Sequence, residues 1–255
     1  MDSNPSKIRI GLNGANGRMC RAIKDEISQN SKYIIAFGID KTPSQNPDFP
    51  IFKEFNDLLT CDVLIDFSYH TATMPALDFA VKNRIPILVA TTGHTKEERE
   101  RILKAGEDIP VFFASNTSLG VYLTILLAKT AAEFLDESFD VEIVETHHRG
   151  KADSPSGTAL AIADAIRNVK ASKGKRCTLV TSRSKERVKG EITLHSLRGG
   201  TVVGKHEIHF LGDDERLTVV HEAENKSIYV HGALRAVEFL THAKKGVYGM
   251  QDVVR

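Results

Sequence analysis

The chain has 255 residues, enough for one large domain or two modest ones with buried cores. Its apolar fraction of 41% and charged fraction of 26% are those of an ordinary globular protein, which argues against a disordered chain. The 34 Lys and Arg residues nearly balance the 33 Asp and Glu residues. This balance argues against a nucleic-acid partner, because a dedicated nucleic-acid binder would carry a strong basic excess.

The apolar runs and the cysteines indicate in which cellular compartment the protein is expected. The longest apolar run, residues 119–128, is about half the length of a bilayer crossing, and the first residues show no charged-then-apolar signal pattern. Cys20, Cys61 and Cys177 are widely scattered, which suits a reducing compartment and supports no disulfide framework. We therefore expect a cytoplasmic protein without a membrane partner.

Short apolar runs alternate with helical segments over the first half of the chain. Strands are expected at residues 7–12, 33–39, 62–67, 85–90 and 110–114. Helices are expected at residues 19–27, 71–83 and 95–105, the last of them with a threonine cap. Apolar strands separated by helices predict a Rossmann-like, doubly wound parallel sheet that is covered on both faces.

The pattern changes in the second half, where strands follow one another without helices between them. A long apolar helix at 120–135, a strand at 139–145 and a helix from about residue 157 come first. Further strands are expected at 178–181, 191–197, 205–211 and 216–222, before a closing helix at 227–243. We expect a C-terminal α+β domain with a mainly antiparallel or mixed sheet over residues 119–227. Residues 1–118, completed by 228–255, would form the dinucleotide-binding domain.

A glycine turn lies between the first strand and the first helix. At this position the backbone N–H groups and the positive end of the helix dipole can accept a pyrophosphate. The usual Gly-x-Gly-x-x-Gly is incomplete because Leu12 occupies the first glycine position, so the turn alone is a weak signal. The residues that we assign to the cofactor here are Gly14, Ala15, Asn16, Gly17, Arg18 and Met19.

Asp40 and Lys41 strengthen this assignment because they directly follow the second strand. An Asp at this place accepts hydrogen bonds from an unphosphorylated ribose, whereas a Lys pairs with a 2′-phosphate. The adjacent pair predicts that the protein accepts both NADH and NADPH. The alternative is that Asp40 and Lys41 are solvated turn residues.

Two more loops follow predicted parallel strands, at the edge of the sheet where ligands bind. Their small and hydroxyl-bearing residues would let the backbone approach a nicotinamide ribose, although either loop alone could be a simple turn. The residues that we assign to the cofactor here are Ala90, Thr91, Thr92, Ala114, Ser115, Asn116 and Thr117.

Residues 145–159 are the most informative stretch for chemistry. His147, His148, Arg149 and Lys151 make a local cationic spot in a nearly neutral protein, and such a spot attracts carboxylates. Ser156, Gly157 and Thr158 open a helix, so their backbone N–H groups also point toward an anion. Histidine can donate a proton near neutral pH, and a lysine among other cations can do the same.

Other interpretations of this stretch stay open. Adjacent histidines can ligate zinc, but no cysteine or well-spaced acid accompanies them, so we predict no metal. The stretch could also be a solvated loop, with Asp153 or Ser154 serving only as helix caps.

The run from His147 to Ala159 closely resembles the signature of the 4-hydroxy-tetrahydrodipicolinate reductase (dihydrodipicolinate reductase) family of lysine and diaminopimelate synthesis. The resemblance spans nearly the whole chain. It includes the glycine turn, the Thr-Thr-Gly turn at 91–93, and the segments at 116–121, 198–206 and 246–253. Ala90 and Cys20 depart from it, since the family usually has glycine at both positions.

The resemblance implies a function and site residues. Enzymes of this family use a nicotinamide cofactor to reduce a cyclic unsaturated imine dicarboxylate, with loss of water, and are typically homotetramers assembled through the second-domain sheets. His147 would be the proton donor and Lys151 a second donor or proton shuttle. His148, Gly157 and Thr158 would contact the substrate carboxylates, and we also assign Ser156 to substrate binding.

Two rival functions remain. One is a nicotinamide-dependent dehydrogenase of another small carboxylate or phosphate, such as a semialdehyde or aspartate. The other is a non-catalytic dinucleotide sensor, which the basic run at 147–158 disfavours because a sensor needs no proton donor beside anion-binding groups.

Overall fold

A computed structural model describes residues 7–43 and 48–254. The contacts within it divide the chain into two units. Unit 1 comprises Met1–Ser118 and Tyr229–Arg255, and unit 2 comprises Leu119–Ile228. Each unit has its own sheet, its own helices and its own apolar core.

Unit 1 contains a seven-stranded parallel sheet, as the apolar runs predict. The strand order is β12-β6-β5-β4-β1-β2-β3, and every pairing is parallel. The strands are β1 (Ile8–Asn13), β2 (Tyr33–Ile39), β3 (Ile51–Phe52), β4 (Val63–Asp66), β5 (Ile87–Val89), β6 (Pro110–Phe113) and β12 (Gly246–Tyr248). The central strands are buried on both sides, which explains their nearly uninterrupted apolar sequences.

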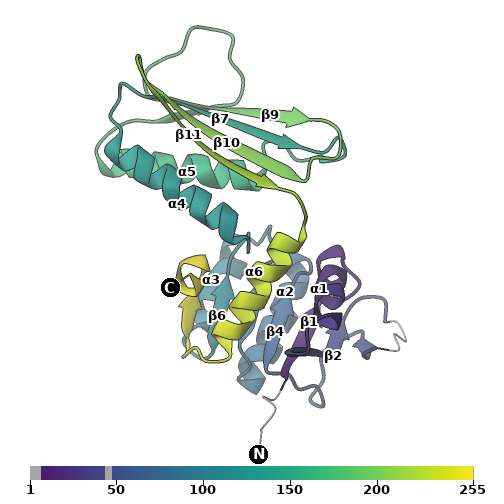
Figure 1. Ribbon diagram of the computed structural model, residues 1–255. Helices are drawn as coiled ribbons and strands as arrows, with labels where there is room; N and C mark the ends of the chain where they lie inside the picture. Colours follow the sequence, from purple (N-terminus) through teal and green to yellow (C-terminus); the bar gives the residue numbers. More distant parts are fainter. Residues whose placement is uncertain (1–6, 44–47, 255) are drawn as a thin grey trace, which may run out of the picture. The chain divides into compact units, whose positions relative to one another are not determined.

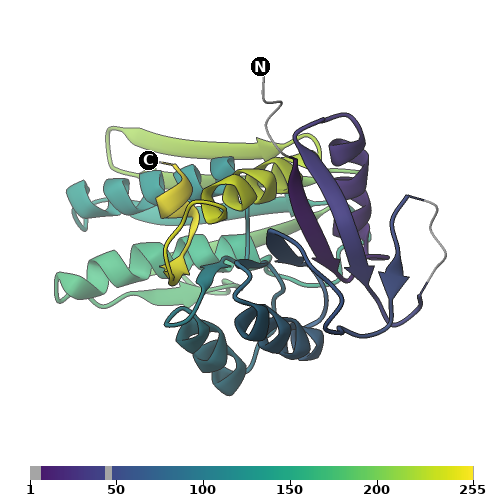
Figure 2. The ribbon, with the colours of Figure 1, turned by 90° about the horizontal axis from the view of Figure 1, so that it is seen from below.

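Helices cover both faces of this sheet, with α2 and α3 on one face and α1 and α6 on the other (Figure 2). The helices of unit 1 are α1 (Arg18–Ser28), α2 (His70–Asn83), α3 (Lys96–Ala105), α6 (Ser227–Leu240) and α7 (Met250–Val253). Helix α3 begins with the expected cap, since the Thr95 hydroxyl accepts from the Glu98 N–H and the Glu98 carboxylate accepts from the Thr95 N–H.

The strand order places a topological switch at β1. The chain leaves β1 toward β2 on one side, and it later builds β4, β5 and β6 on the other side. Right-handed crossovers in two directions leave a crevice at the carboxyl ends of the strands beside such a switch, which is where ligands bind in open α/β sheets.

Unit 2 has a five-stranded sheet in the order β11-β10-β7-β9-β8, with α4 and α5 side by side on one face (Figure 1). Its elements are α4 (Leu119–Phe134), β7 (Asp140–His147), α5 (Gly157–Ser172), β8 (Thr178–Val180), β9 (Glu191–Arg198), β10 (Gly204–Leu211) and β11 (Arg216–Ala223). Burial alternates strictly along β7, with Val141, Ile143, Glu145 and His147 on the buried face.

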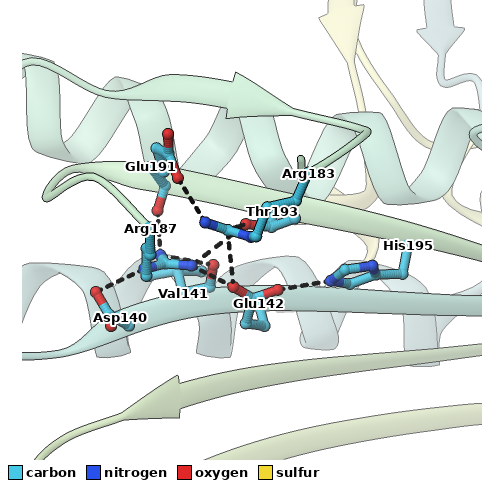
Figure 3. Close-up of polar contacts among 8 residues, drawn as sticks. All are labelled: Asp140, Val141, Glu142, Arg183, Arg187, Glu191, Thr193 and His195. Carbon is cyan, nitrogen blue, oxygen red and sulfur yellow. Dashed lines mark hydrogen bonds and ion pairs between the residues drawn. The ribbon is translucent and has the colours of Figure 1, made fainter. Parts of the chain in front are cut away.

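The sheet of unit 2 is mixed. β10 pairs antiparallel with β7 and β11, whereas β9 pairs parallel with β7 and β8. β8 and β9 are consecutive yet parallel, because residues 181–190 return the chain to the starting edge. Arg183 and Arg187 hold this return loop by ion pairs to Asp140, Glu142 and Glu191 (Figure 3).

Several boundaries differ from the expected ones. β7 continues through His147, so the first histidine of the basic run is a strand residue rather than a loop residue. Helix α6 ends at Leu240 instead of residue 243, and β3, β12 and α7 were not predicted. These three elements have two to four residues each, too few to show a period. Among the described helices, none has the length and apolarity to cross a membrane.

Candidate functional site

A cavity of about 680 Å³ opens at the switch point of unit 1. Four strand ends contribute to it: the glycine turn after β1, the turn after β2, and the segments after β3 and β4. The lining residues are Asn13, Gly14, Gly17, Ile39, Asp40, Lys41, Lys53, Glu54, Phe55, Phe67, Ser68, Tyr69, Ala72 and Pro75.

Gly14 is required by the geometry of this cavity. Its φ of +81° lies in the left-handed region, and a Cβ there would approach the Phe67 carbonyl oxygen to 2.8 Å. The backbone of the turn therefore lies directly against the end of β4. Helix α1 begins immediately afterward, and its N-cap, Gly17, provides no side-chain cap. The first turn of α1 is thus available to an anion such as a pyrophosphate.

Asp40 organises the glycine turn as well as lining the cavity. Its carboxylate accepts hydrogen bonds from the Asn16 N–H at 3.0 Å and from the Thr42 N–H at 3.2 Å. The Asn16 amide in turn donates to the Thr42 carbonyl at 2.7 Å. Lys41 and Lys53 line the same cavity with exposed side chains, so the site combines a fixed carboxylate with two cations.

The sequence does not predict the buried carboxylate of Asp66 at the end of β4. Asp66 is fully buried and accepts hydrogen bonds from Asn13 at 2.8 Å, from Thr73 at 2.6 Å and from the Ser68 hydroxyl. These bonds tie together the ends of β1 and β4 and the start of α2, which fixes the floor of the cavity. Asp66 lies inside the strand predicted at residues 62–67, and no pattern in the sequence indicates the network.

The loops after β5 and β6 end at the same edge of the sheet, but their residues are not among those that line the cavity. Thr91 is buried, and its hydroxyl accepts from the Ser68 N–H at 2.9 Å. The Thr117 hydroxyl donates to the Tyr229 carbonyl at 2.7 Å and so joins its loop to α6. Ala90 is also buried, whereas Ser115 is exposed.

In unit 2, the last residue of β7 carries the central histidine. His147 is 8% exposed, and its Nδ1 lies 2.5 Å from Oε2 of Glu145, two residues earlier on the same face of the strand. Burial lowers the pKa of His147, and the Glu145 carboxylate opposes that shift.

Glu145 is itself fully buried and is held by an arginine from the neighbouring strand. The two Nη atoms of Arg198 donate to the two carboxylate oxygens at 2.7 and 2.9 Å, a bidentate pair. Burial alone would raise the pKa of Glu145, but hydrogen bonds from Arg198 and Ser196 outweigh it and lower the pKa to about 2. Glu145 is therefore ionised at neutral pH.

Ser156, which we predict to bind substrate, is the N-cap of α5. Its hydroxyl accepts from the Ala159 N–H at 3.1 Å as the N-cap of α5 and lies 3.0 Å from Nε2 of His206. Its own N–H donates to Glu145 at 3.2 Å. The hydroxyl and the N–H of Ser156 are thus both engaged inside the protein, and the residue is 2% exposed.

His206 was not predicted from the sequence. Its ring packs edge-on against that of His147, with centroids 5.3 Å apart. Burial, followed by the neighbouring His147, lowers the pKa of His206 to about 4, so this second imidazole is neutral at pH 7.

A basic hollow of about 390 Å³ adjoins the end of β7. Residues 148–150 form one wall, Gly200, Thr201 and Val203 form another, and Lys226 completes the lining. His148 lies here as expected, whereas Lys226 was missed because it is 75 positions beyond Lys151 with no recognisable motif of its own. Lys151 forms an ion pair with Asp153 at 2.9 Å. Gly157, at the start of α5, borders open space.

In the described part of the chain, no group of three or more His, Cys, Asp or Glu side chains is arranged so that it could hold a metal ion. Nδ1 of His147 contacts Glu145, and His148 lines the neighbouring basic hollow.

The switch-point cavity of unit 1 and the histidine–carboxylate site of unit 2 define a two-unit protein of the dinucleotide-dependent reductase type. The family model described as dihydrodipicolinate reductase, N-terminus, matches residues 8–117, and that described as dihydrodipicolinate reductase, C-terminus, matches residues 120–254. The chain belongs to the dihydrodipicolinate reductase family.

Individual relatives agree with this membership. The 4-hydroxy-tetrahydrodipicolinate reductase of Caldanaerobacter subterraneus subsp. tengcongensis is 40% identical over 97% of this chain and 98% of its own length. That of Akkermansia muciniphila is 38% identical over 97% and 98%. The structure of a dipicolinate-bound dihydrodipicolinate reductase from Paenisporosarcina sp. TG-14 covers 98% of this chain and 100% of its own, with a TM-score of 0.80 at 22% identity.

Proposed function

We propose that this protein reduces 4-hydroxy-tetrahydrodipicolinate to tetrahydrodipicolinate, with loss of water. The reductant is NADH or NADPH, and the reaction belongs to lysine and diaminopimelate synthesis. Unit 1 would be the dinucleotide-binding domain and unit 2 the substrate-binding and oligomerisation domain. The observation that carries the proposal is the buried Glu145–His147 pair beside a basic hollow, within a chain that matches the family along its length.

The residues of unit 1 fit a nicotinamide dinucleotide. The glycine turn and the uncapped start of α1 suit the pyrophosphate, while Asp40 and Lys41 suit the adenosine ribose and its 2′-phosphate. We assign the loops that contain Ala90, Thr91 and Thr92, and Ala114 to Thr117, to the nicotinamide end. The bound reduced cofactor supplies a hydride.

The residues of unit 2 supply charge and a proton. Hydride addition to the conjugated ring leaves an electron-rich enamine, which needs a proton from an acid. Protonated His147 provides that acid at Nε2, because its Nδ1 is committed to Glu145. His148, Lys226 and the first turn of α5 at Gly157 and Thr158 hold the two carboxylates and stabilise the developing charge.

An absorbance assay of NADPH and NADH oxidation tests this function. We expect oxidation that depends on freshly generated 4-hydroxy-tetrahydrodipicolinate. Aspartate and aspartate semialdehyde serve as the alternative substrates, and turnover with either of them alone would favour a different dehydrogenase. Binding of the dinucleotide without turnover of any of these compounds would indicate a sensor.

Lys151 is expected to contribute to both turnover and substrate binding. Replacing Lys151 with alanine should lower kcat and raise KM, each on the order of 10-fold, because the loop loses a cation and a proton source. Lys129→Ala, on the exposed side of α4, is the matched control and should leave both constants unchanged. Unchanged kinetics in Lys151→Ala would show that Lys151 is only a surface charge, with no role in turnover or substrate binding.

Lys41 is expected to select the phosphorylated cofactor. Lys41→Ala should weaken NADPH binding by about 10-fold and leave NADH binding nearly unchanged, because only NADPH carries the 2′-phosphate. Calorimetric titration of both cofactors measures this, with Lys96→Ala on α3 as a control. An NADPH preference that survives Lys41→Ala would remove the phosphate-binding role from this residue.

We also propose a homotetramer assembled through unit 2 and a cytoplasmic location. The family resemblance supports the assembly, and the three unpaired cysteines suit a reducing compartment. Light scattering of the purified protein measures the assembly, and a monomer at micromolar concentration would contradict it.

A further inference from the structure

The hydrogen bonds of the Glu145 carboxylate determine which ring nitrogen of His147 carries the proton. Both oxygens of Glu145 are occupied: Oε1 accepts from Arg198 and from the Ser156 N–H, and Oε2 accepts from Arg198 and faces His147. An ionised carboxylate can only accept hydrogen bonds, so the ring nitrogen at 2.5 Å must be the donor.

This requirement fixes the tautomer of the imidazole. In the neutral ring one nitrogen carries the proton, and its neighbour decides which. Nδ1 donates to Glu145, which leaves Nε2 without a proton in the free protein. Nε2 lies beside Gly204, where a Cβ would approach it to 3.1 Å. Because Gly204 has no side chain, the position next to Nε2 that a Cβ would occupy is left open.

We propose that Glu145, held by Arg198, is a positioning residue that locks His147 in the Nδ1–H tautomer, so that only Nε2 exchanges protons with the substrate. The inference rests on the proposed function for its kinetic consequence, but the tautomer itself does not. Glu145 is buried behind the imidazole and acts on the reaction through it.

The charged surroundings of His147 set the direction of the pH effect. Glu145 on its own strand is the anion that contacts it, while Arg198 on β9 and Lys151 in the following loop oppose the charged ring. Asp153 faces Lys151, and His206 on β10 is neutral. Removing the negative charge of Glu145 therefore lowers the pKa of His147, so the protonated donor is lost at a lower pH.

A second glutamate on β7 offers an internal comparison. On the opposite face of the strand, Glu142 is likewise bound by Arg183 and Arg187 and contacts a histidine, His195 (Figure 3). There the contact is made by Nε2, 2.6 Å from Oε2 of Glu142, and the ring is half-exposed. We therefore expect opposite tautomers for the two histidines when neutral, Nδ1–H in His147 and Nε2–H in His195.

Nuclear magnetic resonance of the full protein labelled with ¹⁵N-histidine tests the tautomer without any turnover. Long-range ¹H–¹⁵N correlations distinguish protonated from unprotonated ring nitrogens, and His147→Gln and His195→Gln identify the two sets of signals. We expect a protonated Nδ1 and a bare Nε2 for His147 at neutral pH. A protonated Nε2 with a bare Nδ1 in His147 would overturn the inference, whether or not the protein is a reductase.

Kinetics then test the consequence. Glu145→Gln should lower kcat at neutral pH on the order of 100-fold, with a much smaller change in KM, because the amide cannot keep the charged ring in place. The fall of kcat with rising pH should begin at a lower pH than in the parent, so the deficit narrows in acid. Glu145→Asp, which keeps the charge, should recover part of the loss, and Glu26→Gln, which removes the surface Glu26–His231 pair, should change nothing.

The outcomes separate the two claims. A parent protein without reductase activity contradicts the proposed function and leaves the tautomer measurement valid. An active parent with a Glu145→Gln variant of unchanged kcat and unchanged pH profile contradicts the positioning role. Unaltered NADPH affinity shows that a slow variant is folded. If Glu145→Gln does not fold, Glu145→Asp and the tautomer measurement decide.

Discussion

Replacing His147 with glutamine lowers kcat on the order of 100-fold or more, as expected when a general acid is lost. Glutamine has a similar polar reach and can still contact Glu145, but its amide does not ionise and offers no acidic proton. KM and the affinity for NADPH should change little, because His147 lies in unit 2 and is not assigned to either binding role. Steady-state kinetics with the parent protein in parallel measure the effect.

The control for this variant is a histidine that is also paired with a glutamate but lies on the surface. His231 on α6 contacts Glu26 at 3.3 Å, with its side chain about half exposed. His231→Gln should keep the kcat of the parent. A His147→Gln variant that works within a few-fold of the parent would exclude His147 as the proton donor.

Gly232→Ala should destabilise unit 1 by about 3 kcal/mol, although alanine normally stabilises a helix interior by about 1 kcal/mol relative to glycine. A Cβ at Gly232 would lie 1.6 Å from the carbonyl oxygen of Thr117 and 2.7 Å from its carbonyl carbon. Both partners are backbone, so α6 must move away from the loop after β6. Because we assign that loop to the cofactor, the affinity for NADPH should fall as well.

Urea-induced unfolding of the full chain measures this destabilisation. Gly157→Ala is the matched helical control, because a Cβ there meets no atom within 4 Å, and its free energy of unfolding should stay within about 0.5 kcal/mol of the parent. A Gly232→Ala protein as stable as the parent would refute the close contact between α6 and Thr117.

The fold of unit 1 follows from local signals in the sequence. Buried parallel strands such as Val63–Asp66 and Ile87–Val89 are uninterrupted apolar runs, and the threonine cap at Thr95 is confirmed by its hydrogen bonds. The sheet of unit 2 was harder to predict. β8 and β9 read as a simple succession of strands, but residues 181–190 return the chain and make the pair parallel, which depends on contacts made by Arg183 and Arg187.

The candidate site likewise contains some residues that the sequence alone identifies and others that only the structure reveals. His147, His148 and Lys151 stand out because they are adjacent cations in a nearly neutral chain. Glu145 ends the strand predicted at 139–145 and begins the stretch 145–159, but no role is predicted for it, and Arg198 and His206 lie about 50 and 60 residues further along. They reach His147 only because β9 and β10 flank β7. Such partners come from sheet register, which no pattern local to the basic run reveals.

A crystal structure of the protein with dipicolinate and NADPH would show whether Nε2 of His147 faces a bound dicarboxylate. We expect the two carboxylates of dipicolinate to contact the first turn of α5 and the basic hollow. Nε2 of His147 would face the ring, with Glu145 still bound to Nδ1. Dipicolinate bound away from this loop, or an imidazole turned so that Nε2 no longer faces the ligand, would contradict it.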